Sequence, residues 1–190
     1  MSIRSFVALS LPSDIANQLG DMSAKMSYID KARALKWVDQ ENYHTTLAFL
    51  GDQNTADIDA LAEKLDENLL QTEFEATVMQ ISPFPESKPK LLAALLEKTD
   101  ALDAIHKQVT SSVYACGLMM DKRKFNPHIT LARYRHNKVD FVNSVHSNVD
   151  MQIVFDEVVI YESILTSRGA EYEPIYRFPL DIYDEIGEQY

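Results

Sequence analysis

The sequence of 190 residues contains a single cysteine, Cys116, which excludes an intrachain disulfide and any zinc site built from several cysteines. We expect Cys116 to be a buried small hydrophobe near a helix end, and we expect a cytoplasmic, reducing location. No apolar run approaches the roughly 20 residues that cross a bilayer. The opening segment meets Pro12 and Asp14 too early for a signal peptide. The sequence therefore predicts no membrane association.

Motifs of nucleotide and metal chemistry are also missing. There is no GxxxxGK[ST] segment, which disfavours a P-loop kinase or NTPase, and no serine or cysteine nucleophile signature. There is no HExxH segment, and His106, His136 and His146 have no partner at metal-ligand spacing. We expect no metal and no cofactor, and no obligate protein partner is evident.

Basic residues are scarce, since 18 Lys and Arg oppose 29 Asp and Glu, for a net charge of −11. Such a chain should repel a long nucleic-acid backbone. Residues 122–138 nevertheless hold six basic residues and no acidic one, which leaves the rest of the chain at −17. The segment is either a solvated loop with chance clustering or a local anion site. The second reading favours a small phosphate or an RNA end over a long duplex.

Hydrophobic patterning predicts alternating strands and helices. We expect strands over 3–9, 35–38, 43–50, 74–81, 90–97, 127–134, 151–165 and 175–180. We expect helices over about 12–28, 56–70 and 100–115. A helix remains an alternative for 90–97, a Pro-rich loop spans 82–89, 139–149 are ambiguous, and 167–174 read as a turn. Short connections between strands indicate antiparallel pairing in an α+β layered fold. No linker divides residues 1–190, so we expect one domain.

The most informative feature is a repeated motif, HTTLA at 44–48 and HITLA at 128–132. The copies lie 84 residues apart, and a strand and a helix precede each one, which suggests two half-domains related by a pseudo-twofold axis. On a strand, residues i, i+2 and i+4 share a face. The predicted cleft face therefore carries His44, Thr46 and Ala48 in one copy, and His128, Thr130 and Ala132 in the other. The alanines should leave space beside the polar side chains, and Thr45, Leu47 and Phe49 should point the other way.

Two imidazoles and two hydroxyls around one point suit phosphodiester hydrolysis. One neutral and one protonated histidine supply a base for water and an acid for the leaving oxygen. The threonine hydroxyls donate to non-bridging oxygens. Zinc coordination by the two histidines is an alternative, but it requires a third ligand. A non-catalytic module that binds RNA ends or nucleotides is another.

The sequence resembles the 2H phosphoesterases, and among them the RNA 2′,3′-cyclic phosphodiesterases once called 2′–5′ RNA ligases. The segments that carry the resemblance are IRSFVALSLP at 3–12, WVDQENYHTTLAFLGD at 37–52, FP at 84–85, FNPHITLAR at 125–133 and YESILTSRGAEYEPI at 161–175. The resemblance implies a bilobal α+β fold with lobes of antiparallel sheet, flanking helices and a central cleft. It implies no metal requirement. The substrate would be RNA or a nucleotide ending in a 2′,3′-cyclic phosphate.

By position, the resemblance makes His44 the proton donor to the leaving ribose oxygen and His128 the acceptor that activates water. It makes Thr46 and Thr130 phosphate ligands. The product would be a 2′-phosphomonoester, and 2′–5′ ligation would be the reverse type of reaction at the same site. Another cyclic phosphate or a 2′–5′ linkage is the alternative substrate.

Arg133 is a further candidate for phosphate binding, because the family often has arginine there. Strict alternation puts Arg133 on the face away from His128, so the strand must bend after Ala132 if Arg133 contacts phosphate. Tyr134 and Phe125 are expected to pack, as is the single tryptophan, Trp37. The role of Arg168 is left open.

Overall fold

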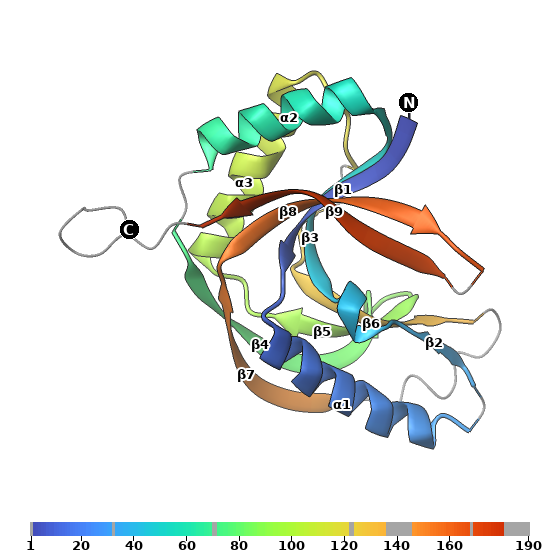
Figure 1. The fold of residues 1–190 in the computed structure, drawn as a ribbon. Helices are drawn as coiled ribbons and strands as arrows, with labels where there is room; N and C mark the ends of the chain where they lie inside the picture. The colour runs from blue at the N-terminus through green and yellow to red at the C-terminus, as the bar shows by residue number, and fades with distance from the viewer. Residues whose placement is uncertain are drawn as a thin grey trace.

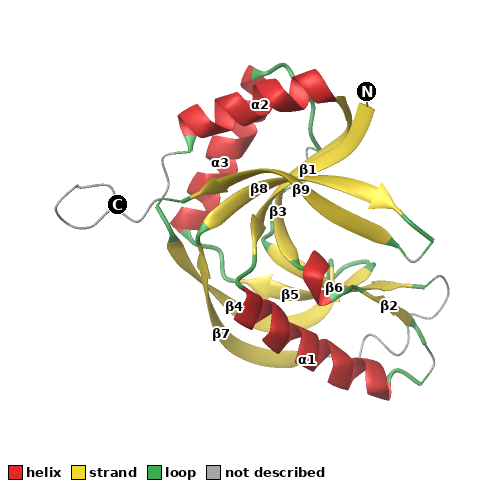
Figure 2. Ribbon diagram, in the orientation of Figure 1, coloured by secondary structure: helices red, strands yellow, loops and turns green. Residues whose placement is uncertain are grey.

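The structure is a computed structural model that describes residues 2–31, 33–69, 72–121, 124–135, 146–167 and 169–180 (Figure 1). Strands, shown yellow in Figure 2, alternate with helices along the chain. The strands are β1 (Ser2–Ser10), β2 (Leu35–Trp37), β3 (His44–Asn54), β4 (Phe74–Phe84), β5 (Leu91–Leu96), β6 (His128–Tyr134), β7 (Ser147–Phe155), β8 (Glu157–Leu165) and β9 (Ala170–Pro179). The helices are α1 (Ser13–Ile29), α2 (Thr55–Asn68), α3 (Asp100–Ala115) and the short 3-10 helix η1 (Gln40–Asn42).

All of these strands belong to one antiparallel sheet, in the order β7-β4-β5-β6-β3-β1-β8-β9, with β2 paired to β6. The two motif strands, β3 and β6, lie side by side at the centre. Their ladder contains one pair, Thr45 opposite Ile129, so the two halves of the sheet are joined by a narrow contact. The predicted α+β fold with antiparallel pairing is confirmed.

The two halves have the same register around their motif strands. The pairs between β3 and β1 are His44–Ser10, Thr45–Leu9, Thr46–Ala8, Ala48–Val7 and Phe49–Phe6. The pairs between β6 and β5 are His128–Leu95, Ile129–Ala94, Thr130–Ala93, Ala132–Leu92 and Arg133–Leu91. The pairs correspond one to one. Within the motif each strand also has one extra residue, Leu47 or Leu131, which makes a β-bulge at the same position of both copies, and β3 has a second irregularity at Leu50. These registers support the predicted pseudo-twofold relation.

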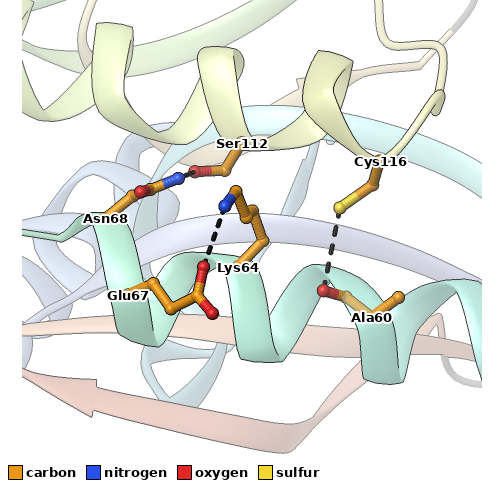
Figure 3. A network of polar contacts seen from close by, with 6 residues as sticks. All are labelled: Ala60, Lys64, Glu67, Asn68, Ser112 and Cys116. Carbon is orange, nitrogen blue, oxygen red and sulfur yellow. Dashed lines mark hydrogen bonds and ion pairs between the residues drawn. The ribbon is translucent and has the colours of Figure 1, made fainter.

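The helices α2 and α3 pack against each other beside β3, and the single cysteine lies where they meet (Figure 3). The Asn68 side chain of α2 donates to the Ser112 hydroxyl of α3 at 3.2 Å. Cys116, which follows α3, is half-buried with its sulfur 3.7 Å from the carbonyl oxygen of Ala60. The predicted position near a helix end is confirmed, although the residue is less buried than expected. No helix in the described ranges has the length and apolarity of a membrane span.

The predicted long strand over 151–165 is wrong. The run is split at Asp156, whose carbonyl oxygen accepts from the backbone N–H of Leu180 at 2.7 Å. Residues before the break pair with β4, and residues after it pair with β1 in the other half of the sheet. Buried residues alternate in β7, whereas three consecutive residues are buried in β8, and only Asp156 and Glu157 separate the apolar residues of the two strands, so the break is concealed.

Other boundaries moved by a few residues. β3 continues beyond Gly51, which has a φ of 72°, and β4 takes in the first residues of the predicted 82–89 loop. The 90–97 segment is a strand, so its helical alternative is excluded. The turn predicted over 167–174 is shorter, because β9 begins at Ala170. Arg168, most of 139–149 and the acidic end over 181–190 lie outside the described residues.

The bulge residue Leu131 is fully buried in the core, so Leu131→Ala should destabilise the fold by about 2–5 kcal/mol through lost burial and a cavity. Chemical denaturation followed by circular dichroism measures this loss. Met119→Ala is the control, because that side chain is 79% exposed and should change stability by only about 0.5 kcal/mol. Equal effects of the two substitutions would contradict the packing described for the motif strand.

Candidate active site

The two motifs meet at the Thr45–Ile129 pair. The side of the sheet to which these two side chains point determines the geometry of the site. Both side chains are fully buried on the core side. The residues on either side of them therefore point to the opposite face, where His44, Thr46, His128 and Thr130 are partly exposed. Antiparallel register aligns each histidine with the threonine of the other motif. The four predicted side chains thus come together on one face.

Both histidines are oriented by the same backbone contact. The Nδ1 atom of His44 lies 2.8 Å from the carbonyl oxygen of Asn42, and that of His128 lies 2.7 Å from the carbonyl oxygen of Asn126. A carbonyl can only accept, so Nδ1 carries the proton in each ring. Nε2 is then the unprotonated nitrogen of a neutral ring. In His44 it accepts a hydrogen bond of 3.0 Å from the Thr46 hydroxyl.

Sequence reasoning missed the two asparagines, although the signal was present. The repeat extends two residues towards the N-terminus, as N-x-H-x-T-L-A at 42–48 and 126–132. The Asn42 side chain also donates to the carbonyl oxygen of Ala170 at 3.1 Å, which ties η1 to the start of β9. This bond fixes the backbone that orients His44.

The prediction that Ala48 and Ala132 leave space beside the threonines is wrong. The bulges at the motif leucines turn both alanines into the core, where they are 2% and 0% exposed. The side chains opposite Thr46 and Thr130 are instead Ala8 and Ala93, on the neighbouring strands. Small residues do flank the threonines, but they come from β1 and β5.

The same bulges also determine on which face of the sheet the residues after the two alanines, Phe49 and Arg133, lie. Phe49, expected on the core side, pairs with Phe6, and the Phe6 ring contacts the His44 ring. Arg133 likewise returns to the face of His128 and is exposed. Strict alternation had placed Arg133 on the far face, and the bulge before Ala132 supplies the bend that phosphate contact requires.

Aromatic rings surround both histidines. The ring of His44 lies 4.8 Å from Phe6, 5.2 Å from Tyr172 and 6.2 Å from Tyr161, between centroids. The ring of His128 lies 4.5 Å from Phe84. Sequence patterning did not place these residues at the site, because they come from β1, β4, β8 and β9, far apart along the chain. His44 therefore packs among three aromatic rings, and His128 packs beside one.

This environment makes His44 difficult to protonate. Burial is the largest cause that lowers its pKa, the hydrogen bond to Asn42 opposes the shift, and the nearby charges of His128 and Arg133 add to it, for a pKa of about 4. His44 is therefore neutral near pH 7. The positive charges of His128 and Arg133 therefore act on His44, the former from the motif strand paired with β3.

A pocket of about 940 Å³ adjoins the site. One part of its lining comes from β2 and β6, with Lys36, Trp37 and Arg133, and another comes from the β8–β9 hairpin, with Thr166 and Tyr172. Figure 1 shows the hairpin extending on the same side of the molecule as β2 and the end of β6. Asn42 and Tyr172, which contact His44, also line the pocket, so it continues from the paired motifs.

The remaining aromatic candidates pack as predicted. Phe125 stacks on His106 of α3 with ring centroids 4.1 Å apart, and Tyr134 and Trp37 are partly buried against the core. Burial raises the pKa of Tyr134 to about 12. Among the described residues, no group of three or more His, Cys, Asp or Glu is placed to hold a metal ion.

Comparison with known proteins gives a consistent result. A family model described as the 2′-5′ RNA ligase superfamily matches residues 11–163. An RNA 2′,3′-cyclic phosphodiesterase of Thermotoga maritima is 26% identical over 179 residues, covering 92% of this chain and 94% of that protein. One from Bacillus subtilis is 28% identical over 178 residues, covering 92% of this chain and 95% of that protein.

Solved structures show the same fold. The crystal structure of Escherichia coli LigT in apo form superposes with a TM-score of 0.76 at 24% identity, covering 94% of this chain and 97% of that one. The structure of LigT complexed with 3′-AMP gives the same TM-score and covers 95% and 99%. At this identity the likeness establishes the arrangement of strands and helices alone.

The pKa of His44 is directly measurable. We expect its ring protons to titrate by NMR with a pKa of about 4 in the ligand-free protein, because burial disfavours the imidazolium. Arg133→Gln should raise this pKa, since the variant removes a neighbouring positive charge. A value near the ordinary 6.5 in both proteins would contradict the described environment.

Proposed function

Since this chain belongs to the 2′-5′ RNA ligase superfamily, we propose that it is a hydrolase that opens the 2′,3′-cyclic phosphate ends of RNA or nucleotides to 2′-phosphomonoesters. Its relatives named RNA 2′,3′-cyclic phosphodiesterase match it over nearly their full length. One observation carries the proposal: two matched His-Thr pairs lie side by side with both Nδ1 atoms bound to backbone carbonyl oxygens. In each ring Nε2 is then the nitrogen that exchanges a proton at the phosphate.

In the proposed reaction, His128 accepts a proton at Nε2 from the water whose oxygen attacks phosphorus. The bond from phosphorus to O3′ breaks, and His44 gives the proton on its Nε2 to that oxygen. The 2′-phosphomonoester remains. Aligning each histidine with the threonine of the other motif separates the acid from the base, as an in-line displacement requires. Ligation through a 2′–5′ bond remains a prediction for the same site.

Thr46, Thr130 and Arg133 are proposed to hold the phosphate. In the ligand-free protein the Thr46 hydroxyl donates to the Nε2 atom of His44. Once Nε2 is protonated it no longer accepts, so the hydroxyl becomes available to a non-bridging oxygen. Arg133 supplies a permanent positive charge on the same face, in a protein whose net charge is −11.

The role of proton donor requires that substrate binding protonate His44. A phosphate anion favours the imidazolium, and it also offsets the positive charges of His128 and Arg133 that lower the pKa of His44. Binding and proton uptake are therefore coupled. The cytoplasmic location stays a prediction from the scarcity of cysteine.

This coupling predicts a pH dependence. A nucleoside 2′-phosphate should bind with uptake of a proton, because it raises the pKa of His44 above the value of about 4 in the free protein. The affinity for this ligand should fall as the pH rises from about 4 to the higher pKa of His44 in the complex. Above that pKa, His44 should cause no further change in affinity. Calorimetric titration in buffers of different ionisation enthalpy measures the uptake. Binding without proton uptake at pH 6 would remove the basis for His44 as the acid.

The activity itself is tested with a nucleoside 2′,3′-cyclic phosphate and a cyclic-ended oligonucleotide, with and without EDTA. We expect hydrolysis that survives chelation, because side chains supply the acid, the base and the phosphate donors. His44→Ala or His128→Ala should lower kcat by about 10²–10⁴-fold. Thr46→Ala or Thr130→Ala should cost about 10-fold, the loss of one hydrogen bond.

His146→Ala is the matched control, because this exposed histidine precedes β7 and lines neither the motif face nor the pocket. It should retain the full rate. Loss of activity in EDTA would refute the metal-free mechanism. Equal rates for the wild type and the double variant His44→Ala, His128→Ala would refute the site.

A further inference from the structure

Two positive charges lie directly opposite each other beside the motif strands. Lys36 of β2 pairs with Arg133 of β6 in the antiparallel ladder, so the two side chains project on the same face of the sheet. Both are exposed, and neither makes a hydrogen bond or ion pair with another residue of the described ranges. Like charges in this arrangement repel. An anion placed between or beside them removes the repulsion.

The position of Lys36 is further constrained by the β8–β9 hairpin. A Cβ atom added to Gly169 would lie 3.2 Å from the Lys36 ammonium nitrogen, so the ammonium rests against the hairpin turn. Gly169 has a φ of 148°, a conformation that L side chains rarely adopt. Glycine here permits both the turn and the close approach of the lysine.

The pair also has a defined place relative to the paired motifs. Lys36 and Arg133 both line the 940 Å³ pocket, together with Asn42 and Tyr172, which contact His44. Arg133 belongs to the same strand as His128, whereas Lys36 belongs to the neighbouring strand β2 and lies beside the turn of the β8–β9 hairpin.

We propose that Lys36 binds a second phosphate of the substrate, the one attached to the 5′ oxygen of the nucleotide that carries the cyclic end. This inference rests on the proposed function. In an RNA end, the nearest anion to the cyclic phosphate is the phosphodiester on the other side of the same ribose. With the cyclic phosphate held by the motif threonines and Arg133, the adjoining pocket wall offers the Lys36 ammonium to that group.

The other charges of the pocket confine the anion to this wall. Its acidic lining residues are Asp39, Glu41, Glu171 and Glu173. These carboxylates repel a phosphate, so the favourable position is the side formed by β2 and β6. The site therefore selects substrates with one upstream phosphate over those with none. Among the described residues that line the pocket, Lys36 and Arg133 are the basic ones, and the chain as a whole is acidic.

Three substrates test the proposal: a nucleoside 2′,3′-cyclic phosphate, the same compound with a 5′-phosphate, and a dinucleotide with a cyclic end. The wild type should show a higher kcat/KM for the second and third than for the first. Lys36→Ala should lower kcat/KM for these two by about 10-fold, as expected for one hydrogen bond to a charged group. It should change the first by less than about twofold, because that substrate has no second phosphate.

Two further variants control for charge and folding. Lys36→Arg keeps the positive charge and should retain most of the preference. Lys107→Ala removes one exposed lysine from α3, outside the pocket, and should leave all three rates unchanged. The advantage of the 5′-phosphorylated substrates should also shrink as salt is raised, because an exposed lysine is readily screened.

Equal kcat/KM values of the wild type for all three substrates would overturn the proposal while leaving the hydrolase function intact. An equal loss by Lys36→Ala on all three would also overturn it, and would place Lys36 at the reacting phosphate. A wild type that opens none of them would refute the hydrolase function, and the second-phosphate site would fall with it.

Discussion

The active-site geometry depends on one contact between two strands, Thr45 of β3 opposite Ile129 of β6. Because both side chains of this pair are buried, the neighbouring histidines and threonines must face the other way. Because the ladder is antiparallel, each imidazole is aligned with the hydroxyl of the opposite motif. A slip of one residue would turn all four side chains into the core. The buried Thr45 and Ile129 therefore determine the orientation of the four polar side chains of the site.

The two halves repeat more than a motif. Each histidine hydrogen-bonds through Nδ1 to the carbonyl oxygen of an asparagine two residues earlier, and each strand bulges at the motif leucine. The halves differ in what surrounds these equivalent parts. His44 is enclosed by aromatic rings and is neutral in the free protein, whereas His128 lies within the basic stretch of the sequence, residues 122–138. Equivalent backbones thus hold two imidazoles in different surroundings.

The repeat and the alternation of strands predicted the helices, most strands and the four central side chains, because these depend on local periodicity and residue type. Strict alternation failed at Ala48 and Ala132, since a bulge has no signature in five residues of sequence. The prediction of one strand over 151–165 failed because two apolar strands of different halves follow each other with only Asp156 and Glu157 between their apolar residues. The aromatic rings around His44 and the opposition of Lys36 to Arg133 depend on long-range pairing, which a single sequence does not reveal.

The central claim is that both Nε2 atoms act on one phosphate. The most direct test is a crystal structure of the protein with a bound nucleoside 2′-phosphate. The account predicts that the two Nε2 atoms lie within about 3 Å of different oxygens of the same phosphate, with the Thr46 and Thr130 hydroxyls on the others. A phosphate bound by Lys36 and Arg133 alone, with neither histidine in hydrogen-bond reach, would contradict it.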